Sequence, residues 1–198
     1  MKIITQSIKD CLEVQLNKGI EDITDKELEN IKILNLNRID INKILNVYYD
    51  ELSYFKNLEE LNISNCMINN NLMQNIKKLK NLKNLNIYNS DFIDECYIFL
   101  TNLNIENLVI DNCLGIKDIA FNNLNKLILK NTNEDIYAKN ITSLDISNIN
   151  NSDNNFYLEN IKELIISKKN KNIVNIINVD KIIVIDERLD IIEVIQHD

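Results

Sequence analysis

The stretch Leu58–Ile68, LEELNISNCMI, carries the pattern that most constrains this chain. Apolar residues stand at its positions 1, 4, 6 and 11, and the small residue Cys66 stands at position 9. The pattern recurs seven more times. One copy cannot bury its apolar side alone, so the copies must stack and share a continuous core. The sequence therefore predicts a repeat protein.

Each repeat opens with a short strand in which inward and outward residues alternate, as in Leu85-Asn86-Ile87. We expect these strands to stack in parallel. The repeats begin at Ile31, Leu58, Leu82, Ile105, Leu124, Ile141, Ile161 and Val179. Residues expected to face the core are Leu85, Ile87, Leu108, Ile110, Leu127 and Leu129.

The connecting segments shorten along the chain, since the spacing of repeat starts falls from 27 residues to 18. The early segments are long enough for a helix. In the segment after Ile68, Leu72, Met73, Ile76 and Leu79 have the spacing of one buried helical face. From Leu124 onward the coils predict turns, extended segments or single 3₁₀ turns.

The pattern LxxLxLxx(N/C/S/T)xL resembles the leucine-rich repeat signature. Position nine is occupied consecutively by Cys66, Ser90, Cys113 and Thr132. The resemblance implies an α/β solenoid, a horseshoe with a concave parallel β-sheet and a helical to irregular convex side. It also implies that position nine is buried and bonds to the backbone of neighbouring coils.

The N-terminal region is similar to the cap and first repeat of internalin-like bacterial proteins, on the stretch Asp22–Leu28 and the following Leu34-Asn35-Leu36 and Tyr54–Leu58. The chain lacks their 22-residue period and a signal sequence. At position nine the first and the last two repeats hold Ile39, Lys169 and Glu187 instead of a small polar residue. The resemblance to internalin-like proteins therefore does not imply a cell-surface function for this chain.

The pattern predicts one domain over residues 1–198, with a helical cap at 1–30, about eight repeats at 31–188 and a C-terminal cap at 189–198. Ser7 can begin a helix with Ile8 and Leu12 on its apolar face, which Asn17 to Gly19 would end. Thr24 and Glu27 have the spacing of a capping box.

The C-terminal end must hide an apolar cross-section and an unpaired strand edge. Ile165, Ile183 and Ile185 are expected at outward positions there. We expect a terminal strand with Ile192 and Val194 toward the core and Glu193 toward water. The alternative is a homodimer that pairs these edges, which would make the chain a self-assembling structural module.

Composition narrows the classes of ligand. The net charge of −8 and pI near 4.8 disfavour nucleic acid, whose binding depends on clustered lysine and arginine. Only two glycines are present, which disfavours a phosphate-cradling loop.

Neither a signal peptide nor a membrane-spanning run of about 18 apolar residues is found, so an intracellular, cytoplasmic protein is expected. With no proline, asparagine can supply the left-handed turns.

No residue pattern indicates catalysis, a metal site or a cofactor, and we expect no enzyme. The single histidine, His197, stands one residue from the C-terminus. The cysteines lack CxxC spacing and are expected to be buried thiols. Asp94 with Glu95, Glu134 with Asp135 and the run Lys168–Lys171 fit solvated surface, with acid–base or anion-binding roles as alternatives.

The resemblance implies that outward strand residues line a surface that recognises another protein. Tyr88 is the one aromatic anchor on this face, which contains many asparagines. The alternative is that these residues only make the sheet soluble. We expect a monomer that binds an as yet unidentified protein. The candidate residues are Glu60, Asn62, Asn84, Asn86, Tyr88, Asn107, Asp111, Lys126 and Lys130.

Overall fold

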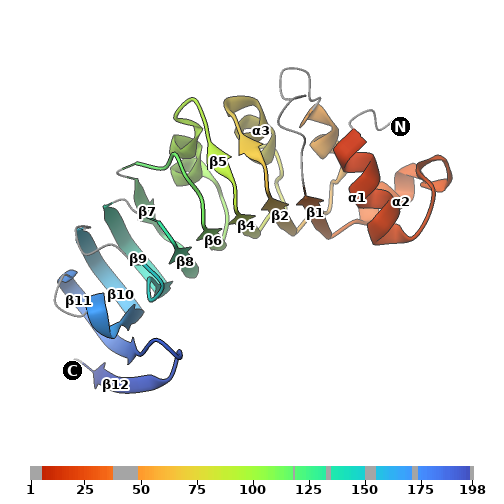
Figure 1. Cartoon of the computed structure of the whole chain (residues 1–198). Helices are drawn as coiled ribbons and strands as arrows, with labels where there is room; N and C mark the ends of the chain where they lie inside the picture. Colours follow the sequence, from red (N-terminus) through yellow and green to blue (C-terminus); the bar gives the residue numbers. More distant parts are fainter. Residues whose placement is uncertain are drawn as a thin grey trace. The chain divides into compact units, whose positions relative to one another are not determined.

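The computed structural model describes residues 6–37, 49–117, 119–132, 135–149, 155–170 and 174–196, without the side chains of residues 7, 49 and 174–176. The chain forms two compact units, Met1–Ile105 and Glu106–Asp198. Figure 1 labels their helices and strands. Within the described residues no helix is long and apolar enough to cross a membrane.

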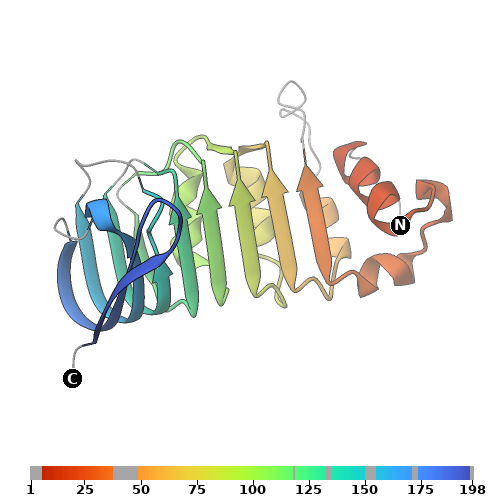
Figure 2. The ribbon, with the colours of Figure 1, turned by 60° about the horizontal axis from the view of Figure 1, so that its bottom comes forward.

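The first unit begins with α1 (Gln6–Leu16), the 3₁₀ helix η1 (Ile20–Asp22) and α2 (Asp25–Asn30), within the range expected to form the cap. Ile8 and Leu12 of α1 are fully buried, and the helix ends just before Asn17. Gln15 of α1 donates a side-chain hydrogen bond to the Ile33 carbonyl of β1 (Ile33–Asn37), at 2.5 Å. Figure 2 shows α1 beside β1. The cap therefore covers the edge of this strand.

The capping box at α2 is confirmed. The backbone N–H of Glu27 donates to the Thr24 hydroxyl at 3.3 Å, and the N–H of Thr24 donates to the Glu27 carboxylate at 3.0 Å. Hydrogen bonds from Lys18 and from the backbone and hydroxyl of Thr24 lower the pKa of Glu27 to about 2. The carboxylate therefore stays charged at neutral pH and fixes the start of the helix.

Three consecutive strands of the first unit pair in parallel, namely β1, β2 (Glu60–Ser64) and β4 (Asn84–Tyr88). The register joins Leu34 to Leu61 and Leu61 to Leu85, so equivalent repeat positions stand side by side. The short strands β3 (Met67–Ile68) and β5 (Asp91–Phe92) form a second parallel pair. A repeat-like arrangement of parallel strands is thus observed.

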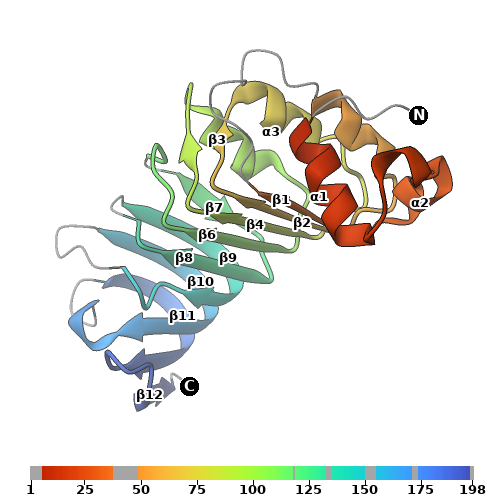
Figure 3. The ribbon, with the colours of Figure 1, turned by 45° about the vertical axis from the view of Figure 1, so that its right-hand side comes forward.

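Helical segments connect these strands, as the spacing predicted. They are η3 (Tyr49–Tyr54), α3 (Asn70–Ile76) and η4 (Cys96–Asn102), and Figure 3 shows α3 on one side of the strands. Leu72, Met73 and Ile76 are buried at 1% exposure or less. The helix ends at Ile76, so Leu79 lies in the following turn and is only half-buried.

The second unit is nearly all strand. Parallel pairing joins β6 to β8, β8 to β9, β9 to β10, β10 to β11, and β7 to β9. The expected 3₁₀ turn is η5 (Lys168–Asn170). The strands are β6 (Asn107–Asp111), β7 (Ala120–Asn122), β8 (Lys126–Lys130), β9 (Ile136–Asp145), β10 (Phe156–Ser167), β11 (Val174–Ile185) and β12 (Ile191–Gln196).

Strands β9, β10 and β11 each contain an asparagine in the left-handed conformation, Asn140, Asn160 and Asn178, with φ of 55° to 56°. Each strand thus has a segment before this residue and one after it. The earlier segments of β9, β10 and β11 continue the parallel pairing that begins at β7, whereas the later segment of β9 pairs with β8. Asparagine supplies the turn, as expected.

The repeat register is confirmed by burial. The residues that begin the eight repeats are all buried, at 8% exposure or less. The six strand residues expected to face the core, Leu85, Ile87, Leu108, Ile110, Leu127 and Leu129, are at 2% exposure or less. The small residues at position nine are buried too, from Ser90 at 1% to Thr132 at 8%.

The predicted C-terminal strand forms, but the expected facing of its residues is wrong. Strand β12 pairs antiparallel with β11, and Glu193 stands opposite the fully buried Val184, while Ile192 and Val194 are 46% and 51% exposed. The alternation along β12 is out of phase with the expected one, because Glu193 and Ile195 are half-buried whereas Ile192, Val194 and Gln196 are exposed.

The outward isoleucines of β11 also differ from expectation. Ile183 and Ile185 are only 8% and 7% exposed. Val194 and Ile191 of β12 stand opposite them, so the added strand covers part of their surface. Ile165, one strand earlier, is half-buried.

Replacing Leu108 by alanine should lower the free energy of unfolding by about 2–5 kcal/mol, because the residue is 1% exposed and its removal leaves a cavity in the core. Chemical denaturation measures the change. The matched control is Val109→Ala on the half-buried outward side of β6, expected to cost about 1 kcal/mol or less. Equal effects of both substitutions would contradict the register.

Candidate functional site

The outward side chains of β2 and β4 form the candidate surface of the first unit. Because neighbouring strands are in register, Glu60 stands beside Asn84, and Asn62 stands beside Asn86. Tyr88, at the end of β4, stands beside Ser64. All five predicted site residues of this unit are half-buried and on one face, as the period of two requires.

A chain of amide hydrogen bonds runs across this face. Asn86 Nδ2 donates to Asn62 Oδ1 at 2.7 Å, and Asn62 Nδ2 donates to Asn35 Oδ1 of β1 at 2.8 Å. Asn62 also donates to Glu60 Oε1 at 3.0 Å. The side chains are therefore held in fixed directions before any partner arrives. Asn35 was missed in the sequence analysis, although the 27-residue repeat spacing places it in the column of Asn62.

The second unit brings the other predicted residues together in pairs. Asn107 stands beside Lys126, and Asp111 stands beside Lys130 on the adjacent strand. Asp111 Oδ1 accepts a hydrogen bond from Asn131 Nδ2 at 2.8 Å, which fixes the carboxylate at the end of β6.

Tyr137 and Tyr157 form an aromatic stack that the sequence analysis missed. Their rings are parallel within 6°, with centroids 4.6 Å apart. They lie on the segments of β9 and β10 that precede Asn140 and Asn160. Their 20-residue separation equals the spacing of the repeat starts Ile141 and Ile161, so extending the register to the earlier segment would have revealed the column.

An open groove of about 280 Å³ lies along this stack. Lys139 and Glu159 form an ion pair of 2.7 Å at its border. Ile177, also at the border, is 62% exposed. The residues lining the groove are Ala120, Asn122, Tyr137, Ala138, Lys139, Tyr157, Leu158, Glu159 and Ile177.

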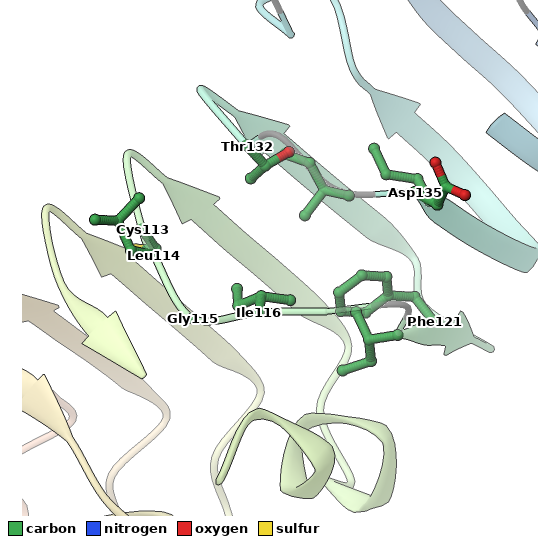
Figure 4. A pocket seen from close by; sticks show the side chains of 10 residues that line it. Cys113, Leu114, Gly115, Ile116, Phe121, Thr132 and Asp135 are labelled. Carbon is green, nitrogen blue, oxygen red and sulfur yellow. The ribbon is translucent and has the colours of Figure 1, made fainter. Parts of the chain in front are cut away.

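A smaller cavity of about 90 Å³ lies inside the second unit (Figure 4). Its lining includes Cys113, Ile116, Phe121 and Thr132, and is mostly apolar. The Thr132 hydroxyl is buried without a hydrogen-bond partner in the described part of the chain, so its position-nine contact to a neighbouring backbone, which the family resemblance implies, is not made. The cavity is large enough for a few water molecules.

Ser90 makes the contact expected of position nine, because its hydroxyl accepts a hydrogen bond from the Cys66 N–H one coil earlier, at 3.1 Å. The same hydroxyl donates to the Tyr88 carbonyl at 2.7 Å. At the later repeats, Lys169 and Glu187 are instead exposed and form an ion pair of 2.8 Å. Ile39 lies outside the described residues.

The cysteines are all thiols, of which Cys66, Cys96 and Cys113 are buried, as predicted, whereas Cys11 is half-buried. Burial raises the pKa of Cys96 to about 11 and also raises that of Cys11. Because the thiolate is the reactive form, both side chains are poor nucleophiles at neutral pH.

Of the carboxylates and lysines with possible chemical roles, Asp135 is half-buried and accepts hydrogen bonds from Asn155, and the other described ones are exposed. Asp94 and Glu95 are exposed in a left-handed turn, and Lys168 and Lys169 are exposed in η5. His197, Glu134 and Lys171 lie outside the described residues. Among those described, no group of three or more His, Cys, Asp or Glu side chains is placed to hold a metal ion.

A scan against protein-family models found no family that matches this chain, and a search of curated proteins found no match either. The candidate surfaces are therefore defined by the geometry of the two units.

Proposed function

We propose that this chain is a non-enzymatic, protein-binding module of the leucine-rich repeat type, which recognises its partner through the outward residues of its parallel strands. The parallel pairing, the burial of all eight repeat starts and the bond between Ser90 and Cys66 support the repeat assignment. Because the sequence contains the repeat pattern, we also propose that the chain forms a leucine-rich repeat horseshoe with an internalin-like cap.

The observation that carries the binding proposal is the amide chain from Asn86 through Asn62 to Asn35. Ordering flexible side chains at an interface costs about 0.5–1.5 kcal/mol each. Asparagine side chains that already bond to one another are ordered before binding, so they lose less conformational entropy at the interface. Tyr88 lies on the same face and offers an aromatic anchor of the kind that dominates protein interfaces.

The partner in this proposal is an intracellular protein that binds a monomer of this chain. A net charge of −8 disfavours nucleic acid. Lys126 and Lys130 beside Asn107 and Asp111 give the second unit both signs of charge, which suits a mixed polar protein surface. No cofactor is required.

Replacing Tyr88 by alanine should weaken binding of a partner co-purified from the native source by about 2 kcal/mol, because the substitution removes the anchor from the ordered face. Isothermal titration calorimetry measures the affinity. Tyr97→Ala, a change of another half-buried tyrosine in η4, should leave binding unchanged. Undiminished binding by the Tyr88 variant, with its fold retained, would exclude this face.

A second candidate function is self-assembly through β12. This strand and the turn before it expose Leu189, Ile191, Ile192 and Val194 at 46–70%. Two antiparallel copies of the strand would cover these side chains and generate a twofold dimer. The observed pairing of β12 with β11 instead supports the proposed self-capped monomer.

If the chain is a self-capped monomer, light scattering at micromolar concentrations should give the mass of one chain, because β12 already covers the edge of β11. A dimer that Val194→Lys dissociates would favour self-assembly instead. Val14→Lys is the control, since Val14 of α1 is 84% exposed and lies far along the chain from β12.

A further inference from the structure

The aromatic stack belongs to a column of register partners in the second unit, which continues beyond Tyr157 to Asn175 of β11. Ala120 of β7 is the register partner of Tyr137 in β9, and Tyr137 is the partner of Tyr157 in β10. Partners in parallel strands project from the same side of a sheet. From Ala120 to Tyr157, the column thus contains one methyl group followed by two stacked rings.

The spacing of this column suits one more ring. Adjacent strands lie about 4.8 Å apart, and the two tyrosine rings are 4.6 Å apart. A ring placed over the exposed Ala120 would lie at about the same distance from Tyr137 as Tyr157 does. Offset-stacked aromatic pairs at this spacing are favourable beyond the area that they bury.

The groove beside the column has room and suitable polarity for such a ring. Ala120 and Asn122 line it together with both tyrosines. Lys139 and Glu159 neutralise one another at its border, so the site does not strongly select a charged ligand. Asn122 and Glu159 offer hydrogen-bond acceptors for a polar ring edge, such as a phenol hydroxyl or an indole N–H.

We propose that this groove binds a tyrosine or tryptophan side chain of a partner protein, with the aromatic ring over Ala120 and stacked on Tyr137. The groove is open, whereas sites for free small molecules bury most of the ligand. A ring carried by a protein obtains its remaining contacts elsewhere. This inference deepens the proposed protein-binding function by naming the chemistry of a partner residue, and it rests on that function.

The test uses N-acetyl-tryptophanamide as the probe and the full-length chain, which contains no tryptophan, so that the probe's indole fluorescence can be observed selectively. Fluorescence titration should show saturable binding with a Kd in roughly the millimolar range, as suits a single stacked ring in an open site. NMR should show shifts of the Tyr137 ring signals. N-acetyl-leucinamide should bind at least tenfold more weakly.

Ala120→Tyr is the decisive variant, because its own ring should occupy the position of the ligand and reduce probe affinity at least tenfold. Ala120 is exposed, so the larger side chain can be accommodated. Tyr137→Leu should reduce affinity similarly by removing the stacking surface. Tyr97→Leu is the control and should bind the probe as the unaltered chain does.

Unchanged probe binding by a folded Ala120→Tyr variant, or equal binding of the leucine probe, would overturn the inference. The aromatic groove can be disproved without disproving the proposed protein-binding function. A partner whose binding depends on Tyr88 but not on Ala120 supports protein binding and rejects the aromatic groove. If a tryptophan-containing peptide from the partner loses at least tenfold in affinity to Ala120→Tyr, the groove is assigned to that side chain.

Discussion

The structure depends on asparagines that adopt a left-handed backbone where the coils turn. Asn123, Asn140, Asn160 and Asn178 have φ between 55° and 59°. Their side chains bond in series, each amide donating to the preceding asparagine oxygen at 3.0–3.1 Å. Most residues are strained in this conformation, whereas asparagine tolerates it. A chain with two glycines and no proline therefore turns at residues that also join one coil to the next.

This constraint determines what the candidate surfaces look like. Once the turns align, strands can pair only in register, so chemically equivalent residues form columns across the strands. Asn35, Asn62 and Asn86 become a bonded series in the first unit, and Tyr137 and Tyr157 become a stack in the second. The same alignment buries the apolar positions. Core and surface order thus have one physical origin.

The sequence predicts the core well, because period-two alternation within a strand and the recurrence of the pattern both act locally. It predicts the last strand less well. Alternation within β12 shows that successive residues face opposite sides, but not which of the two sides faces the core when β12 pairs with β11. The candidate residues fall on the expected faces, but amide bonding between Asn62 and Asn86 is a property of the assembled sheet. The tyrosine stack could have been predicted from the repeat spacing, if that spacing had also been applied to the strand segments that precede Asn140 and Asn160.

The most direct test of this account is the unfolding free energy of Asn160→Gly and Asn160→Ala. Asn160 donates to Asn140 and accepts from Asn178, at 3.0 and 3.1 Å. Glycine accepts the left-handed backbone but lacks the amide, so we expect a loss of about 1–3 kcal/mol for two hydrogen bonds. Alanine should lose about 1–2 kcal/mol more, because its Cβ is strained there. Lys162→Ala, at an exposed position of the same strand, should change little. Stability equal to that of the unaltered chain in both Asn160 variants would contradict the account.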